Sequence, residues 1–189
     1  MPLKDDLQMS LDAISRELIH GLPHQASDAG TIGDPKTRAV KKVLERMGHA
    51  KGMFVCGHGC EDDGEWLLDL LWMDKKDWRI VLAVESEWGN QGEIESDFLK
   101  LLSVKAHKKL MIFSSANRTQ DVMERIRALM VKYPFHLAGE EYMALDIAMQ
   151  GVSRYSFTVP NNGRIDAANF AHLNGALEWP WGAVLAASG

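Results

Sequence analysis

The segment EWLLDLLWMDKKDWRIVLAVESEW, residues 65–88, decides the fold of this 189-residue chain. It contains two runs of aliphatic and aromatic residues that are separated by a polar stretch, residues 74–77. Apolar runs of this length with polar ends predict two strands, one from Glu65 to Met73 and one from Arg79 to Trp88. The aliphatic start of the second strand is typical of a central strand that is buried on both faces.

Both predicted strands carry acids among their apolar residues. Alternate side chains of a strand share a face, so Asp69 lies on one face of the first strand, while Glu85 and Glu87 share a face of the second. A hairpin would bring Asp69 and Glu85 to one edge of the sheet. Buried carboxylates are costly unless they are paired or bind a metal, and such oxygen ligands suit Mg²⁺ or Mn²⁺. The alternative is ion pairs with nearby basic residues, namely Arg79, Lys75 and Lys76.

The segments outside this hairpin alternate between helical and strand patterns. Apolar spacing of three and four predicts helices, which are expected at residues 35–47, 92–107 and 119–132. Short apolar runs predict further strands, at residues 53–56, 110–113, 141–147 and 154–159. The middle of the chain therefore has the order α-β-β-β-α-β, which indicates an α/β domain.

The length and composition predict one domain over residues 1–189. It comprises an N-terminal helix at 4–20, a loop at 21–34 and a core at 35–160. With 46% hydrophobic residues, no long apolar run and no signal peptide, the chain is expected to be cytoplasmic and to have no membrane contact. A net charge of −5 argues against a protein that coats nucleic acid non-specifically, although it is compatible with an enzyme whose acids hold metal ions.

The order of elements and acids resembles the PD-(D/E)XK nuclease superfamily. Asp69 matches the motif aspartate, and Glu85-Ser86-Glu87 matches the second half of the motif, with glutamate where lysine is usual. The resemblance covers about residues 34–113. It implies a restriction-endonuclease-like core, with a mixed central sheet flanked by helices. It also implies Mg²⁺- or Mn²⁺-dependent hydrolysis of DNA phosphodiester bonds, of the restriction or repair type.

The resemblance further implies roles for individual residues. Asp69 and Glu85 would be the principal metal ligands, and Glu87 would be a ligand or a general base. The usual lysine could instead be replaced by Lys100 on the following helix, where the alternative is a solvated helix face. The preceding helix often supplies another glutamate in this superfamily, and Glu45 lies in the matching place.

Other functions stay open at this stage. Without the motif lysine, the protein could be an inactive nuclease fold that binds nucleic acid or protein, or a structural partner whose first helix docks or forms a homodimer. Cysteines 56 and 60 flank a glycine-rich turn, which favours packing over a zinc site. Two basic clusters, on the helix at 35–47 and at residues 105–109, could contact phosphates or simply face solvent. No role is assigned to the tryptophans Trp88, Trp179 and Trp181.

Overall fold

The computed structural model describes residues 9–26, 35–60, 67–115, 118–148, 151–165 and 175–177. Its helices are α1 (Leu11–Ala26), α2 (Pro35–Ala50), α3 (Gln91–Ser103) and α4 (Thr119–Lys132). Its strands are β1 (Phe54–Cys56), β2 (Leu70–Met73), β3 (Ile80–Glu87), β4 (Ala106–Phe113), β5 (Glu141–Ala148), β6 (Gly151–Thr158) and β7 (Gly175–Leu177). The predicted order α-β-β-β-α-β is therefore confirmed from α2 to β4.

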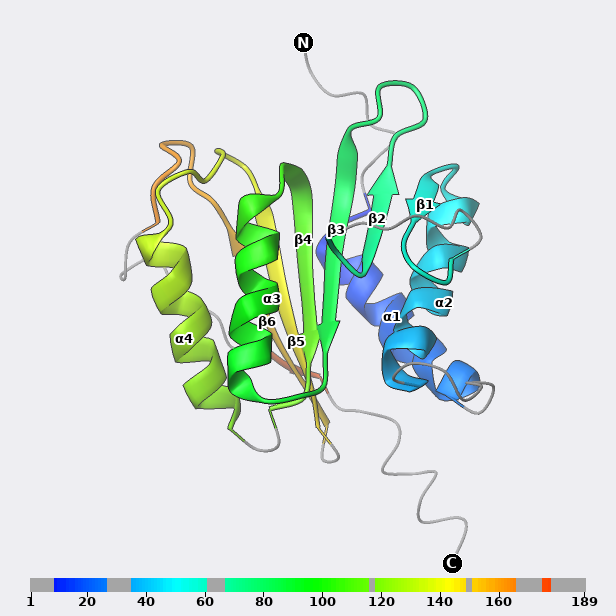
Figure 1. The fold of residues 1–189 in the computed structure, drawn as a ribbon, viewed down its shortest axis with the longest axis horizontal. Helices are drawn as coiled ribbons and strands as arrows, with labels where there is room; N and C mark the ends of the chain where they lie inside the picture. The colour runs from blue at the N-terminus through cyan, green and yellow to red at the C-terminus, as the bar shows by residue number, and fades with distance from the viewer. Residues whose placement is uncertain are drawn as a thin grey trace, which may run out of the picture.

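The strands form one mixed, open sheet in which neighbours follow chain order (Figure 1). Six strands, β1 to β6, make up its body, and the short β7 pairs with β6. The pairs β3 with β4 and β4 with β5 are parallel, and the other pairs are antiparallel. The ends of β3, β4 and β5 consequently share the edge at the bottom of Figure 1, which is also where β2 begins.

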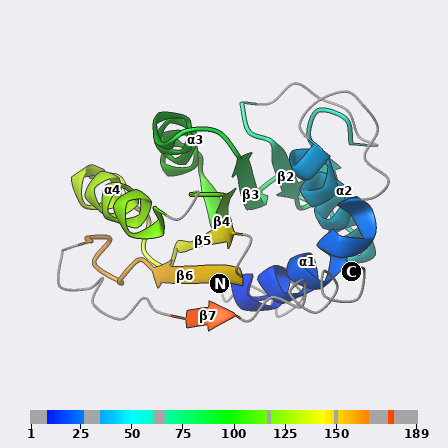
Figure 2. The ribbon, with the colours of Figure 1, turned by 90° about the horizontal axis from the view of Figure 1, so that it is seen from below.

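Helices cover both faces of the sheet, and each face has its own apolar core. The helices α3 and α4, which connect the parallel strands, lie on one face, and α1 lies on the other (Figure 2). Leu44 of α2 packs with Leu82 and Leu110 on the α1 face, whereas Phe98 of α3 packs with Ala83 and Met111 on the opposite face. This two-faced burial explains the continuous apolar runs at the start of β3, residues 80–84, and at the end of β4, residues 110–113. No helix in the described ranges is both long and apolar enough to cross a bilayer.

The structure corrects the predicted ends of the first two helices. Helix α1 continues to Ala26, into the predicted loop at 21–34, while residues 4–8 and 27–34 lie outside the described residues. Helix α2 passes through Gly48 and ends at Ala50. A Cβ at position 48 would lie 2.5 Å from Val55, so glycine here allows α2 to approach β1 closely. The turn after α2 contains Gly52 at φ +72°, a backbone conformation that favours glycine.

The predicted helix at 92–107 was too long. Helix α3 ends at Ser103, and Val104 is extended, with its N–H bonded to the carbonyl of Lys100. Strand β4 then begins at Ala106 and buries two lysines that had been read as part of an exposed basic cluster, Lys108 and Lys109. Lys108 pairs with Glu141 and Lys109 with Glu140, at the start of β5. These two lysines are therefore neither solvent-exposed nor available for phosphate contacts, the two alternatives expected for this cluster.

The strand predicted from Glu65 starts later than expected. Strand β2 begins at Leu70, so Asp69 directly precedes the strand instead of lying inside it. The cause is a pair of contacts between residues distant in sequence: around Asp69, hydrogen bonds that involve side chains of this residue and Glu85 replace the backbone ladder. Residues 65 and 66 lie outside the described ranges.

Candidate metal centre

Asp69 and Glu85 lie next to each other at the shared edge of the sheet. The N–H of Asp69 donates to Oε2 of Glu85 at 3.3 Å, and the N–H of Ser86 donates to Oδ2 of Asp69 at 2.9 Å. The antiparallel pairing of Leu70 with Val84 puts the two acids opposite each other. The predicted hairpin thus brings these two site residues together.

Two lysines contact this pair of acids, and they come from different helices. Lys100 of α3 places its Nζ 3.2 Å from Oε1 of Glu85 and 2.7 Å from Oδ1 of Asp97. Lys41 of α2 places its Nζ 3.0 Å from Oδ1 of Asp69. Because α2 and α3 pack on opposite faces of the sheet, each acid receives its cation from a different face.

The environment of Glu85 disfavours its ionised form. Its side chain is only 2% exposed, and this burial, together with the negative charges of Asp69 and Asp97, raises the pKa of the carboxyl group to about 8. The charge of Lys100 opposes the shift. Oε1 is buried without a hydrogen bond of good geometry, although the Lys100 ammonium is near. Glu85 is therefore a buried acid with one oxygen that only charge stabilises.

Glu87 follows on the same face of β3 and is partly exposed. Its Oε1 accepts the N–H of Gly89 at 2.6 Å. Burial and the nearby carboxylate of Asp97 raise the pKa of Glu87, while the N–H of Gly89 opposes the rise. Glu87 and Glu85 thus share an acidic neighbour, because the charge of Asp97 on α3 raises the pKa of both.

The start of α2 is tied to the end of β3 by polar contacts. The indole N–H of Trp88 donates to Oγ1 of Thr37 at 3.0 Å and to Oγ of Ser86 at 3.1 Å, and the Lys36 ammonium lies 5.0 Å from the centre of the Trp88 ring. These contacts hold Lys41 at the acids. Glu45 is half-buried one turn further along α2, so the α2 side chain that bonds Asp69 is Lys41 rather than Glu45.

The chemistry of this site fits a divalent cation. Carboxylate oxygens are the ligands that Mg²⁺ and Mn²⁺ prefer, and Oε1 of Glu85, a buried oxygen without a hydrogen bond of good geometry, could serve as such a ligand. In the part of the chain that the structure describes, no three His, Cys, Asp or Glu side chains are arranged to hold a metal. The ammonium groups of Lys41 and Lys100 instead supply the positive charge, so a bound cation would have to displace at least one of them.

A second buried polar network was missed by sequence reasoning. Lys109 is 1% exposed, and its Nζ donates to Glu140 at 3.1 Å and to the hydroxyl of Tyr142 at 2.9 Å. Tyr142 in turn donates to Glu140 at 2.9 Å, and His136 lies 3.2 Å from the same hydroxyl. Burial lowers the pKa of Lys109, and the charge of Glu140 partly offsets that shift. This network joins β4, β5 and the loop after α4, which indicates a structural role.

Another buried acid lies where β5 approaches its end. Asp146 is 1% exposed and accepts the N–H of Ser115 at 2.9 Å and its hydroxyl at 2.5 Å. The hydroxyl of Thr119 in the first turn of α4 also donates to Asp146. Arg118, at the N-cap of α4, makes no capping side-chain bond. Asp146 therefore fastens the start of α4 and has a structural explanation.

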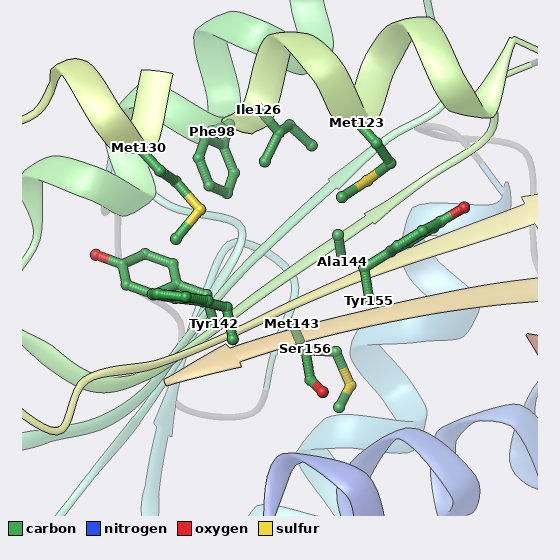
Figure 3. Close-up of a pocket in the computed structure, with 10 residues that line it drawn as sticks. Phe98, Met123, Ile126, Met130, Tyr142, Met143, Ala144, Tyr155 and Ser156 are labelled. Carbon is green, nitrogen blue, oxygen red and sulfur yellow. The ribbon is translucent and has the colours of Figure 1, made fainter. Parts of the chain in front are cut away.

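The apolar hollow between α4 and the strands β5 and β6 lies apart from the acids (Figure 3). Its wall includes Met123, Met130, Tyr142 and Tyr155, and the two methionine side chains extend from α4 toward the strands in Figure 3. The hollow measures only about 20 Å³, which is room for a water molecule rather than for a substrate. It is a packing gap in the α4 face of the sheet.

Comparison with known proteins gives no further assignment. No protein family, no curated protein and no solved structure matches this chain. The site must therefore be judged on its own geometry.

Two residues of the site, Lys41 and Asp97, were not predicted as members. Asp97 had a signal, since it precedes Lys100 by three residues and so shares its helix face. Lys41 had none, because it is one of several basic residues on α2 and only the packing of α2 selects it. The predicted turn at the two cysteines is confirmed: Cys60 donates its N–H to Gly57, and Cys56 is buried on β1.

Proposed function

We propose that this protein is a metal-dependent nuclease of the PD-(D/E)XK kind that hydrolyses DNA phosphodiester bonds. The observation that carries the proposal is the contact between Asp69 and Glu85 at the end of the β2–β3 hairpin. These are the two acids that the sequence resemblance assigns to metal binding. Acids placed together at a sheet edge, with one largely buried, are more typical of a catalytic site than of ordinary surface residues.

The architecture around these acids supports the same proposal. The chain order α2-β1-β2-β3-α3-β4, with β2 antiparallel and β4 parallel to β3, agrees with the core that the resemblance implies. The helices α2 and α3 lie on opposite faces of the sheet. Each of them brings a lysine to the acids.

The residues can be given roles in the proposed reaction. Asp69 and Glu85 would hold Mg²⁺ or Mn²⁺, with Glu87 as a further ligand or as the base that accepts a proton from water. The bound ion would supply a more acidic water and neutralise charge that develops on the phosphate. Lys100 takes the part of the missing motif lysine, since its ammonium already touches Glu85. Glu45 remains a supporting candidate on α2.

A cleavage assay on DNA and RNA tests this proposal. The wild type is incubated with Mg²⁺, Mn²⁺ or a chelator, and a Glu85→Gln variant serves as the matched inactive form. Cleavage of DNA that needs the metal and disappears in Glu85→Gln supports the nuclease. If the wild type and Glu85→Gln cleave equally, the activity comes from elsewhere and the proposal fails.

One observation favours a second candidate, a nuclease fold that binds DNA or a protein without cutting. Both acids already have a lysine partner, and no three-ligand metal group exists among the described residues. The same assay separates the two candidates when it is combined with a gel-shift measurement. DNA binding without cleavage by any divalent metal supports the binding module.

A further inference from the structure

We infer that Lys41 is a second functional lysine of this site, one that exchanges Asp69 for a nucleic-acid phosphate when a divalent cation binds. The inference rests on the proposed metal-dependent function and adds a residue that the sequence resemblance does not assign. It begins from the geometry of the two ion pairs, Lys41 with Asp69 and Lys100 with Glu85.

The two lysines hold their acids in different ways. Lys100 has a second carboxylate partner, Asp97, at 2.7 Å, so it would keep a counter-ion if a cation took Glu85. Within the described ranges, the Lys41 ammonium contacts Asp69 at 3.0 Å and the carbonyl of His58 at 3.5 Å. A carbonyl at the long end of hydrogen-bonding distance is a weak substitute for a carboxylate. A cation on Asp69 would therefore leave the Lys41 charge without a carboxylate partner among the described residues.

The burial of Lys41 makes the loss of its carboxylate partner energetically costly. The Lys41 side chain is only 13% exposed and cannot simply turn fully into water while α2 keeps its position. The contacts of Thr37 and Trp88 with Ser86 fix the start of α2 against β3. An ammonium held at the rim of the acids, with its carboxylate taken by a metal, needs an anion, and the anion that the proposed reaction brings is a backbone phosphate of DNA.

The same geometry predicts competition between Lys41 and the metal. In the metal-free protein, the ammonium occupies Oδ1 of Asp69. Replacing Lys41 by a neutral residue removes this competing cation and should strengthen metal binding, while it weakens DNA binding. Opposite effects of one substitution on two ligands are not expected from a lysine that only supports the fold.

The test uses full-length Lys41→Met, with Lys42→Met as the matched control because Lys42 is the exposed neighbour on the same helix. Mn²⁺ affinity is measured by calorimetry without DNA, and affinity for a short DNA duplex is measured in Ca²⁺ by fluorescence anisotropy. Relative to Lys42→Met, we expect Lys41→Met to bind Mn²⁺ on the order of tenfold more tightly and DNA on the order of tenfold more weakly. Lys41→Arg, which keeps the charge, should bind Mn²⁺ like the wild type.

Equal values for Lys41→Met and Lys42→Met in either measurement overturn the inference. An Asp69→Asn variant separates this failure from failure of the proposed function. If the wild type binds Mn²⁺ and Asp69→Asn does not, the metal site stands whatever Lys41 does. If Asp69→Asn leaves Mn²⁺ binding unchanged, both the metal site and the role of Lys41 are rejected.

Discussion

The acids at the sheet edge and the network around Lys109 both contain buried ionisable groups, but they differ in how well those groups are satisfied. Glu140 receives hydrogen bonds from Lys109 and Tyr142 on both of its oxygens. Glu85 instead has a buried oxygen that makes no hydrogen bond of good geometry to the Lys100 ammonium 3.2 Å away, and two other acids lie near it. A fully bonded buried network rigidifies a core, whereas an incompletely satisfied acid is a feature that a ligand can complete.

The two regions also differ in the direction of their pKa shifts. Burial raises the pKa of Glu85 to about 8, and the negative charges of Asp69 and Asp97 add to this rise. For Glu140, burial also acts to raise the pKa, but the contacts of His136, Lys109 and Tyr142 outweigh it, so the pKa is lowered. Burial alone therefore does not mark a functional acid. What distinguishes the two acids is whether their neighbours are other acids, as at Glu85, or hydrogen-bond donors and a cation, as at Glu140.

The largest expected difference between the regions is in DNA cleavage. Glu85→Gln and Lys100→Met should each lower the rate about 10²- to 10⁴-fold, the range of a lost acid, base or charge contact in catalysis. Tyr142→Phe, which removes a hydrogen bond from the Lys109 network, should leave the rate per folded molecule unchanged. Rates are measured on a fluorescent duplex with the folded fraction checked by circular dichroism. A comparable loss in Tyr142→Phe would erase the distinction between the two regions.

Stability should show the reverse order. Lys109→Met leaves Glu140 buried without its cation, which typically costs about 3–5 kcal/mol of unfolding free energy. Lys105→Met, four residues before Lys109 and exposed, should change the unfolding free energy by less than about 0.5 kcal/mol. Urea unfolding measures both variants. A small loss for Lys109→Met would mean that the network does not hold the core.

Metal binding should raise the melting temperature through the acids at the sheet edge. A cation that binds only the folded state stabilises it by about 2.7 kcal/mol at a concentration one hundred times its dissociation constant. The proton on Glu85 competes with the cation, so Mn²⁺ should stabilise more at pH 8.5 than at pH 6. Thermal unfolding with and without Mn²⁺ measures the effect, which Asp69→Asn should abolish. A shift of equal size in Asp69→Asn would place the metal elsewhere.

The pH dependence of metal-free stability is the most specific comparison. The folded state holds the Glu85 proton more tightly than the unfolded state, whose carboxyl has the ordinary pKa of 4.5, so stability falls as the pH rises from 4.5 to about 8. The slope from this one group is at most about 1.4 kcal/mol per pH unit. Urea unfolding from pH 5 to 8 in chelator should show this slope in the wild type and a flatter profile in Glu85→Gln. Identical profiles would contradict the raised pKa.

Glu140 should change the stability with pH in the opposite direction to Glu85. Its lowered pKa means that its stabilising contribution is present above pH 4.5 and is lost as the pH falls below that value. Glu140→Gln should therefore remove part of the acid sensitivity of the protein below pH 4.5.

How much of this could be predicted from the sequence depended on the range of the interactions. The hairpin and the helix at 119–132 were predicted because apolar period and polar turns are local signals. The start of β2 at Leu70 was not, because the hydrogen bonds around Asp69 come from residues sixteen and seventeen positions away. The end of α3 at Ser103 was missed for a similar reason. The lysines at 108 and 109 lie in strand β4 because they pair with Glu141 and Glu140, which are more than thirty residues away in sequence.

The sequence by itself determined the α/β class, the order of the central elements and the adjacency of Asp69 and Glu85, since hydrophobic period and a short turn dictate a hairpin. The role of individual lysines was decided only by tertiary structure. Lys41, Lys100 and Lys109 look alike as charged residues in the sequence. Helix packing brings Lys41 to Asp69 and Lys100 to Glu85. Lys109, by contrast, lies in the buried strand β4 and pairs with Glu140. The physical reason is that a charge interacts through space with whatever the fold places within a few ångströms, and sequence spacing does not contain that distance.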